Sequence, residues 1–374
     1  MPFSSFSSRS PLFMLAASLV MMGCTAIPTD PGPHKPHHTP NGFQNLPGGG
    51  DKPGFKGFLK WQWERLGREL TPQDASKVPR VALEPSALEG KSPGWTMTWL
   101  GHASVHLQID GLAILIDPVF SGRASPFESI GPKAHNSPPI TLQNLPRVDL
   151  VLISHNHYDH LDEQTVRRLA SQPGGPPTFI GPLGVDRYLR HWGVTSIQTM
   201  DWFDTRTFER PLHANEPLTL EMIPAHHWSR RTLTDTNQTL WAGFRLFTRE
   251  MNLVYTGDTG YSTIFRQMAG KWPPVDWLLV PVGCYEPRWF MGAQHVDPAE
   301  AQRIAEDLGA KNALGVHWGV FRLCDEPVEQ PIEDLRTVQA SLPAQATRIQ
   351  MWAIGERQTL KPGTTSGRSQ TLFE

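Results

Sequence analysis

The chain has 374 residues, with 34 Lys and Arg against 36 Asp and Glu, so its formal net charge is −2. This near-neutral balance argues against a nucleic-acid partner, because proteins that bind nucleic acids usually present a basic face. Three cysteines, Cys24, Cys284 and Cys324, are too few and too far apart for a disulfide framework or a CxxC zinc knuckle. We expect Cys284 and Cys324 to be buried or inert thiols.

The N-terminus has the pattern of an export signal. An apolar run over 11–22 follows a single cation, Arg9. The run is too short to span a bilayer and has the length of a signal-peptide core. Cys24 follows directly after a glycine, as at the cleavage point of a bacterial lipoprotein. We therefore predict a signal peptide over 1–24, acylation of Cys24, and a membrane-anchored lipoprotein of the bacterial cell envelope, on the periplasmic side or at the outer membrane. The alternative is an ordinary secretory signal that contains a chance cysteine.

Two segments separate this signal from the main domain. Residues 25–54 are dense in Pro, Gly and polar residues and predict a flexible tether, in which we assign His34, His37 and His38 no role. Residues 55–94 form a helical or extended segment that begins with "FKGFLKWQWERLGREL". Its interleaved aromatics and cations predict a helix whose aromatic stripe packs on the domain or, alternatively, lies at a lipid interface.

The predicted main domain spans 95–360, with a C-terminal tail over 361–374. "WTMTWL", "SVHLQI" and "LAILID" predict consecutive antiparallel strands, and "VDLVLIS" predicts a strand buried on both faces. A helix capped by Asp162 should follow. The runs "LTLEMIPA", "LWAGFRLFT", "NLVYTGD" and "WLLVPVG" form a second strand series, followed by a helix capped by Asp297. Two strand-rich halves, each followed by helices, predict an α/β sandwich of two central sheets with outer helices.

The polar ends of these strands carry a repeated set of metal-ligand types. His155 and His157 lie two apart, so they face the same way on an extended segment, and Asp159 and His160 follow in the turn. Later strand ends supply four more candidate ligands: His226, His227, Asp258 and His317. Imidazoles and carboxylates without thiolates suit zinc, iron or manganese in an open catalytic site.

The H-x-H-x-D-H spacing directly after a buried strand resembles the metallo-β-lactamase superfamily. The resemblance implies an αββα sandwich of two mixed sheets and two divalent metal ions, preferably zinc, with iron or manganese as alternatives. It assigns His155, His157 and one downstream histidine to the first metal. It assigns Asp159, His160 and His317 to the second metal and makes Asp258 the bridging ligand.

A narrower resemblance covers most of the region from Trp95 to Phe321. The blocks "TWLGHAS", "IDPVFSGRASP", "VLISHNHYDHLD", "HHWSRRTLTDTNQTLW", "GDTGY", "YEPRWFMGAQHVDPAEA" and "VHWGVF" occur in the order seen in N-acyl-phosphatidylethanolamine-hydrolysing phospholipase D. That family has Gln-His-Trp where this chain has His226-His227-Trp228, so alignment on Trp228 makes His227 the ligand. Adjacent residues on an extended segment face opposite ways, and only one of the two histidines should reach the metal.

The implied chemistry is a phosphodiesterase of the phospholipase D type. Two metals roughly 3.5–4 Å apart can hold a bridging hydroxide that attacks phosphorus, with Asp159 and Asp258 as the catalytic carboxylates. The substrate would be N-acyl-phosphatidylethanolamine at a membrane surface, and the products N-acylethanolamine and phosphatidic acid.

For several residues near the predicted site, the sequence leaves both a functional and a structural role open. Gln294 and His295 precede the Asp297 cap and border the substrate cavity in the resembling family, and a purely structural role is the alternative. Arg288 could present a cation to a phosphate or form a structural ion pair. His102 could orient a ligand or be a turn histidine, and we leave it outside the metal set.

Two other functions stay open from the sequence. One is a hydrolase of the same fold that acts on a lactone, a β-lactam or another phosphodiester, because the fold hosts many activities. The other is a non-catalytic metal-binding envelope lipoprotein. The sequence leaves a homodimer open as well.

Overall fold

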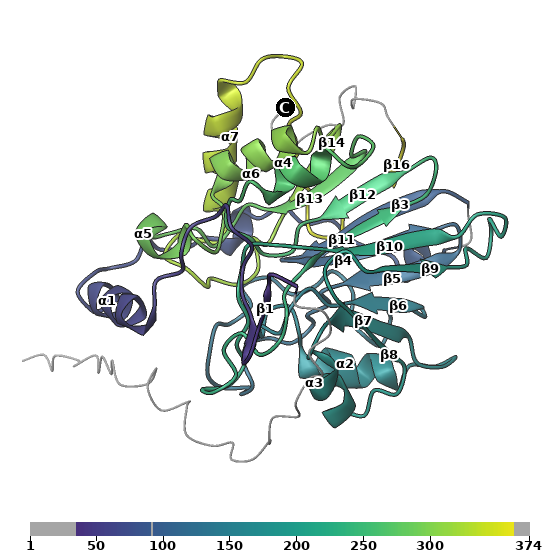
Figure 1. Ribbon diagram of the computed structural model, residues 1–374, viewed down its shortest axis with the longest axis horizontal. Helices are drawn as coiled ribbons and strands as arrows, with labels where there is room; N and C mark the ends of the chain where they lie inside the picture. The colour runs from purple at the N-terminus through teal and green to yellow at the C-terminus, as the bar shows by residue number, and fades with distance from the viewer. Residues whose placement is uncertain (1–34, 91–92, 363–374) are drawn as a thin grey trace, which may run out of the picture.

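The computed structural model describes residues 35–90 and 93–362 and builds them around two stacked sheets (Figure 1). The signal peptide, Cys24, His34 and most of the tail lie outside the described residues. The chain also forms a two-stranded hairpin, β1 (His38–Thr39) and β2 (Gly42–Phe43), ahead of the sheets. Two short 3-10 helices, Ala75–Lys77 and Pro85–Leu88, precede the first long strand.

The first sheet contains seven strands, of which the middle ones follow one another in the chain. In spatial order they are β16 (Arg357–Leu360), β3 (Trp95–Gly101), β4 (Ser104–Ile109), β5 (Leu112–Ile116), β6 (Leu150–Leu152), β7 (Thr178–Pro182) and β8 (Ile197–Met200). The pairs from β16 to β5 are antiparallel and those from β5 to β8 are parallel. The sheet is therefore mixed, and its first three long strands are antiparallel neighbours as predicted.

The second sheet also has seven strands, with an antiparallel part and a parallel part. Its spatial order is β15 (Ile349–Gln350), β14 (Asn312–Val316), β13 (Trp277–Pro281), β12 (Asn252–Tyr255), β11 (Gly243–Phe247), β10 (Leu218–Ile223) and β9 (Thr205–Phe208). Pairs from β9 to β12 are antiparallel, and pairs from β12 to β15 are parallel. Large apolar side chains from the facing strands fill the space between the two sheets, among them Val105, Leu107, Leu220, Met222 and Phe244.

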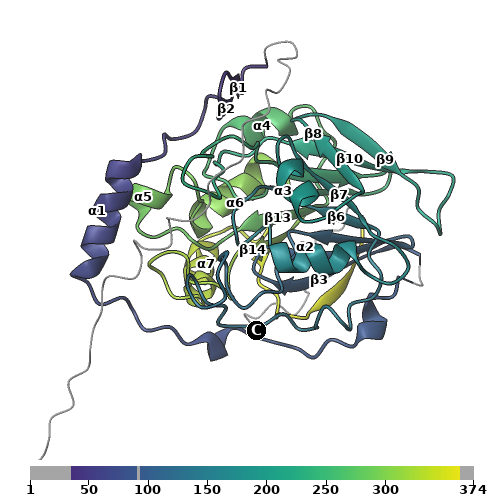
Figure 2. The same cartoon turned by 90° about the horizontal axis from the view of Figure 1, so that it is seen from below.

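Helices cover the two outer faces (Figure 1). The α-helices of residues 35–90 and 93–362 are α1 (Phe55–Leu66), α2 (Glu163–Ala170), α3 (Asp186–His191), α4 (Ile264–Ala269), α5 (Arg288–Met291), α6 (Pro298–Asp307) and α7 (Gln330–Ala340). α2 and α3 lie on the first sheet, whereas α4, α6 and α7 lie on the second. The predicted αββα sandwich is confirmed. α1 stands apart from the layers, beside α5 (Figure 2).

The two predicted helix caps have different outcomes. Asp297 caps α6 as expected: its Oδ1 accepts the Glu300 amide at 2.8 Å, and the Glu300 side chain reaches back to the Asp297 amide. Asp162 stands at the N-cap position of α2, but its side chain makes no cap bond. Its carboxylate instead accepts the Ser121 amide at 3.1 Å and the Ser121 hydroxyl at 2.7 Å, so it holds the loop after β5.

The expectation of free Cys284 and Cys324 is wrong, because the two sulfurs form a disulfide bond. Cys284 follows β13 and Cys324 lies in the segment after β14, and these strands are parallel neighbours. Their following segments therefore return to the same edge of the sheet, which brings the two Cα atoms to 5.0 Å. The disulfide packs beside Trp61 of α1 and Phe290 of α5.

The predicted tether also differs in its second half. Residues 35–52, here called the strap, pack against the sandwich rather than extending freely. His37 and Phe43 of the strap are buried, and Phe43 joins the main core. The composition of the strap is poor in apolar residues, but a few well-placed side chains dock it to the domain.

His106 offers a test of the packing of the first sheet. It lies on β4, fully buried, and burial together with the charge of Arg357 lowers its pKa to about 3. In the unfolded chain the ring protonates near pH 6.5, so folding stability is present above that pH and is lost as pH falls toward 3. For wild type, the loss amounts to at most about 1.4 kcal/mol of unfolding free energy per pH unit. We expect His106→Leu to lack this contribution, so its stability should fall less as the pH is lowered.

The measurement is the urea midpoint of unfolding from pH 6.5 to pH 4.5. Wild type should lose stability more steeply than His106→Leu, whereas His191→Leu, at an exposed position of α3, should follow wild type. Parallel curves for wild type and His106→Leu would show that His106 is charged in the folded protein.

Candidate metal centre

The candidate ligands all leave the ends of strands at one edge of the sandwich. His155, His157, Asp159 and His160 lie in the loop between β6 and α2. The second sheet supplies the rest, with His227 after β10, Asp258 after β12 and His317 after β14. Polar side chains gather here because the carboxyl ends of parallel strands meet at one edge, where the chain turns.

The first cluster contains only imidazoles. His155 Nε2 lies 2.8 Å from His157 Nδ1, and His227 Nε2 lies 3.3 Å from the same atom. His155 and His227 are buried. Three imidazole nitrogens that converge in this way form a donor set suited to a metal ion of the zinc type. A zinc ion would take one lone pair from each ring.

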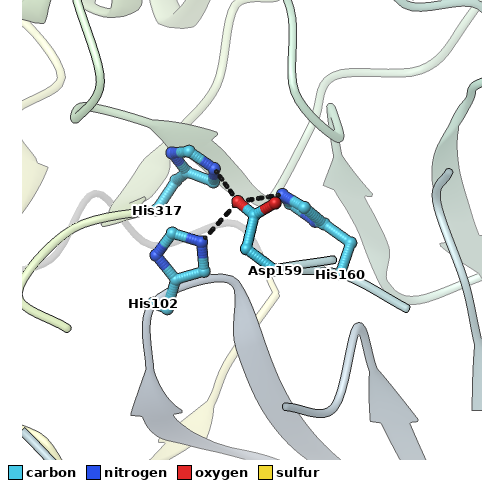
Figure 3. Close-up of side chains that lie close together, drawn as sticks. All are labelled: His102, Asp159, His160 and His317. Carbon is cyan, nitrogen blue, oxygen red and sulfur yellow. Dashed lines mark hydrogen bonds and ion pairs between the residues drawn. The ribbon is translucent and has the colours of Figure 1, made fainter. Parts of the chain in front are cut away.

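The second cluster gathers around one carboxylate oxygen (Figure 3). Asp159 Oδ2 lies 3.2 Å from His317 Nε2, 3.3 Å from His160 Nε2 and 2.9 Å from His102 Nε2. These four residues are buried, and their ligand atoms lie within 4.8 Å of one another. His102, which the sequence left outside the metal set, therefore contacts the cluster through Asp159.

Asp258 lies between the two clusters. Its Oδ2 is 3.9 Å from His155 Nε2 and 3.8 Å from His227 Nε2, on the side of the first cluster. The same oxygen is 3.2 Å from His160 Nε2 and 3.0 Å from His317 Nε2, on the side of the second. One carboxylate thus reaches both clusters, and its Oδ1 is buried without a hydrogen-bond partner.

Burial sets the protonation of the first cluster. Desolvation, reinforced by the neighbouring rings, holds the pKa of His155, His157 and His227 well below the ordinary value. These rings are therefore neutral at neutral pH and have a lone pair for a metal. Burial opposes the charged form of His160 too, but nearby carboxylates, led by Asp258, outweigh it and hold its pKa well above the ordinary value.

Outer partners fix which ring nitrogen faces the centre. Asp117 Oδ2 lies 2.8 Å from His160 Nδ1, and Asp117 also accepts the Ser154 amide at 2.7 Å and the Tyr255 hydroxyl at 2.7 Å. His160 Nδ1–H can donate to this carboxylate, which leaves Nε2 for the centre. His227 Nδ1 lies 2.8 Å from the Gln294 carbonyl oxygen, so its Nε2 is likewise directed inward.

The backbone around the centre is in unusual conformations. Three residues that are not glycine have positive φ: His102 at 51°, Asp117 at 40° and His317 at 63°. Such conformations are costly for residues with a Cβ and cluster at functional sites. Gly257, directly before Asp258, has φ +65°, and a Cβ there would meet the Ala242 carbonyl oxygen at 2.4 Å.

His226 and His227 face opposite ways on the extended segment after β10. His227 enters the first cluster, whereas His226 Nε2 lies 2.7 Å from the Gly50 carbonyl oxygen of the strap. Asn45 of the strap also holds His227: its Nδ2 donates to the His227 carbonyl at 2.9 Å, and its Oδ1 accepts the His227 amide at 3.1 Å. The strap therefore positions a candidate ligand.

The three predicted substrate residues have different surroundings. His295 faces the centre, with Nδ1 3.8 Å from Asp258 Oδ2 and without a hydrogen-bond partner. Burial lowers the pKa of His295 to about 4 despite the nearby Asp258 carboxylate. Gln294 is buried, and its Nε2 donates to the Phe290 carbonyl.

Arg288 is engaged in a structural ion-pair network. It pairs with Asp297 at 3.2 Å and with Glu300 at 2.6 Å. This is the structural alternative of the two readings that the sequence left open.

Sequence reasoning missed two residues of this site. Asp117 directly follows β5, just as the candidate ligands follow their strands. This position could have identified Asp117 from the sequence. Asn45 lies in a segment without strand or helix periodicity, and its contact with His227 spans 182 residues of sequence. A contact between residues so far apart cannot be predicted from the local sequence pattern.

Comparisons with known proteins identify the family of the chain. Residues 113–318 match the family described as "Beta-lactamase superfamily domain". The chain is 37% identical over 278 residues to an uncharacterized protein of Mycobacterium tuberculosis, covering 73% of this chain and 71% of that protein. It is 32% identical over 292 residues to N-acyl-phosphatidylethanolamine-hydrolyzing phospholipase D 1 of Caenorhabditis elegans, covering 75% and 80%.

Among solved structures, the chain resembles the isothiocyanate hydrolase from Delia radicum gut bacteria. The TM-score is 0.57 at 18% identity, covering 72% of this chain and 100% of that one. At this identity the likeness establishes the fold, which is that of the metallo-β-lactamases.

Asp117 provides a test of how the centre is held. We expect Asp117→Asn to weaken metal binding by about 10–100-fold, because the amide no longer accepts all its donors and His160 loses its fixed tautomer. Tyr255→Phe removes one of the bonds to Asp117 and keeps the shape, so its effect should be smaller. Competition with a chromophoric chelator measures both affinities. Wild-type affinity in Asp117→Asn would contradict this role.

Proposed function

We propose that this chain, which belongs to the beta-lactamase superfamily, is a metal-dependent phosphodiesterase of the phospholipase D type. In this proposal it cleaves N-acyl-phosphatidylethanolamine into N-acylethanolamine and phosphatidic acid. The observation that carries the proposal is the pair of ligand clusters that share Asp258. The likeness to the Caenorhabditis elegans phospholipase D supports the choice of substrate.

Two divalent ions, preferably zinc, fit the two clusters. His155, His157 and His227 would hold the first, Asp159, His160 and His317 the second, and Asp258 would contact both. Such a pair supplies Lewis acidity toward a phosphodiester and lowers the pKa of water. The donor set fits, because imidazoles and carboxylates suit zinc, and the outer nitrogens of His160 and His227 already face Asp117 and the Gln294 carbonyl oxygen.

The chain's own groups orient the reaction. His102 lies 2.9 Å from Asp159 Oδ2 and fixes the direction of that carboxylate, which serves the second cluster. His295 is neutral at neutral pH and presents an unpartnered Nδ1 beside Asp258, so it lines the place where a phosphodiester would lie. Arg288 holds the start of α6 and is not assigned to substrate binding.

α1 supports a lipid substrate. Five of its apolar side chains are exposed: Phe55, Phe58, Leu59, Trp63 and Leu66. Phe55, Leu59, Trp63 and Leu66 recur at helical spacing and form one outward stripe, with Trp63 77% exposed. On the inner side, Trp61 stacks on Phe290 with ring centroids 5.0 Å apart. Trp61 is the buried residue of α1, and the helix lies beside α5, apart from the two sheets (Figure 2).

We infer that this stripe docks on a phospholipid surface. Basic side chains accompany it, among them Lys56, Lys60 and Arg68, and they suit anionic headgroups. Within the described residues no helix has the length and apolar character to cross a bilayer. The Cys284–Cys324 disulfide favours an oxidising compartment and agrees with the proposed envelope location, with Cys24 as an acyl anchor.

A product assay tests the reaction. Metal-loaded protein should release N-acylethanolamine from N-acyl-phosphatidylethanolamine, and His227→Gln and Asp258→Asn should each reduce the rate by more than about 100-fold, since both change an expected metal ligand. Removal of metal by a chelator should abolish the rate, and added zinc should restore it. Products are measured by mass spectrometry.

His226→Gln is the matched control for His227→Gln. It changes the adjacent histidine, which points away from the cluster, and should leave the rate within about twofold of wild type. No product from wild type, together with hydrolysis of a lactone or a β-lactam in a parallel panel, would replace the proposed substrate. Equal rates for wild type and Asp258→Asn would refute the proposed centre.

Vesicle binding tests the α1 stripe separately. In a Cys24→Ser chain, where an acyl anchor cannot mask the effect, we expect Leu59→Ser with Trp63→Ser to weaken binding to anionic phospholipid vesicles by at least about tenfold. The reason is that these two side chains would otherwise bury apolar area in the interface. Sedimentation with vesicles measures the bound fraction.

The matched control is Leu212→Ser, which removes an exposed leucine near the hairpin of β9 and β10. That variant should bind as the parent chain does. Equal binding by the α1 double variant and its parent would show that α1 is not the docking surface.

A further inference from the structure

A second group of metal-ligating side chains lies outside the candidate centre, where the strap meets the first sheet. His37 and His38 come from the start of the strap, and Asp201 directly follows β8. We propose that His37, His38 and Asp201 bind a divalent metal ion of the zinc type, which fastens the strap to the sandwich. This site is separate from the candidate centre and does not depend on the proposed function.

The three side chains already converge. His37 Nε2 lies 2.6 Å from Asp201 Oδ1, and His38 Nε2 lies 2.9 Å from Asp201 Oδ2. One ligand atom from each residue lies within 4.8 Å of the others. Zinc binds imidazole nitrogen and carboxylate oxygen at about 2.0–2.2 Å, so ligand atoms around one ion are roughly 3.3 Å apart. A small outward movement of the rings would therefore admit the ion.

The rings are fixed in place by packing. His37 is buried and stacks on Trp202, with centroids 4.2 Å apart. His38 meets Phe43 edge-on at 5.2 Å. Because each ring rests against an aromatic neighbour, both Nε2 atoms stay directed at Asp201. A preformed pair of imidazoles facing a carboxylate is the arrangement that a zinc ion selects.

A lysine occupies the cation position of this site. Lys35 Nζ lies 2.7 Å from Asp201 Oδ2 and 3.9 Å from Asp204 Oδ1, and its side chain is 39% exposed. The two carboxylates therefore attract positive charge, which Lys35 supplies in the structure. Since Lys35 reaches solvent, an incoming ion can displace it outward. Replacement of Lys35 by a neutral residue should therefore strengthen metal binding. A hydrogen-bond network without a metal site would not show this effect.

The strap gives this site a consequence at the candidate centre. Beyond His38 the strap continues to Asn45, which bonds both the amide and the carbonyl of His227. Farther on, Gly50 accepts a bond from His226. An ion that holds the start of the strap would therefore limit the motion of a segment that holds a candidate catalytic ligand.

Zinc stoichiometry on the intact protein tests the site. After chelation and titration with zinc alone, native mass spectrometry should find one more zinc ion per chain in wild type than in His38→Gln. Lys35→Met should fill this position at roughly fivefold lower zinc concentration, because a repelling unit charge is removed. His191→Gln, at an exposed histidine of α3, is the matched control and should keep the wild-type count.

Hydrogen exchange gives a readout that is independent of activity. In an Asp258→Asn chain, which lacks the carboxylate shared by the two clusters, added zinc should slow exchange over 37–50, and this slowing should be absent when His38→Gln is added. The proposal would be overturned if wild type and His38→Gln bound the same number of zinc ions. It would also be overturned if zinc left the rate of hydrogen exchange over 37–50 unchanged. Either result would leave the three residues as a hydrogen-bond network only.

Discussion

The carboxylate of Asp117 joins the two sheets beneath the candidate centre. It ends a strand of the first sheet, and it accepts the hydroxyl of Tyr255 from the second. The same group holds Ser154 and His160, at the two ends of the histidine-rich loop. The positions of ligands from both sheets therefore depend on one buried anion. Loss of that anion would leave several buried donors unsatisfied at once, which is why its replacement should affect the whole centre.

The part of the fold that follows from local pattern could be predicted from the sequence. Short alternating or continuous apolar runs located the strands, and the spacing of His155, His157, Asp159 and His160 announced a metal centre at a strand end. Downstream ligands could be named because each also ended a predicted strand. The αββα layering followed from two such series with intervening helices.

The parts that depend on distant contacts could not be predicted. Cys284 and Cys324 pair because two parallel strands lie side by side, and spacing along the chain does not reveal this. Asp162 has the sequence position of a helix cap, yet its carboxylate binds the loop at Ser121. The strap lacks any periodic pattern, so composition predicted a free tether where single side chains make specific contacts.

The strap extends the part of the chain that the candidate centre requires. The superfamily match begins at residue 113, and the first long strand begins at Trp95. His102 lies upstream of the match, and Asn45 lies upstream of both boundaries, yet each supports a candidate ligand. A fragment cut at either boundary would retain all seven candidate ligands and lose the backbone clamp on His227. For this chain the smallest unit that preserves the geometry of the centre is longer than the smallest unit that preserves the sandwich.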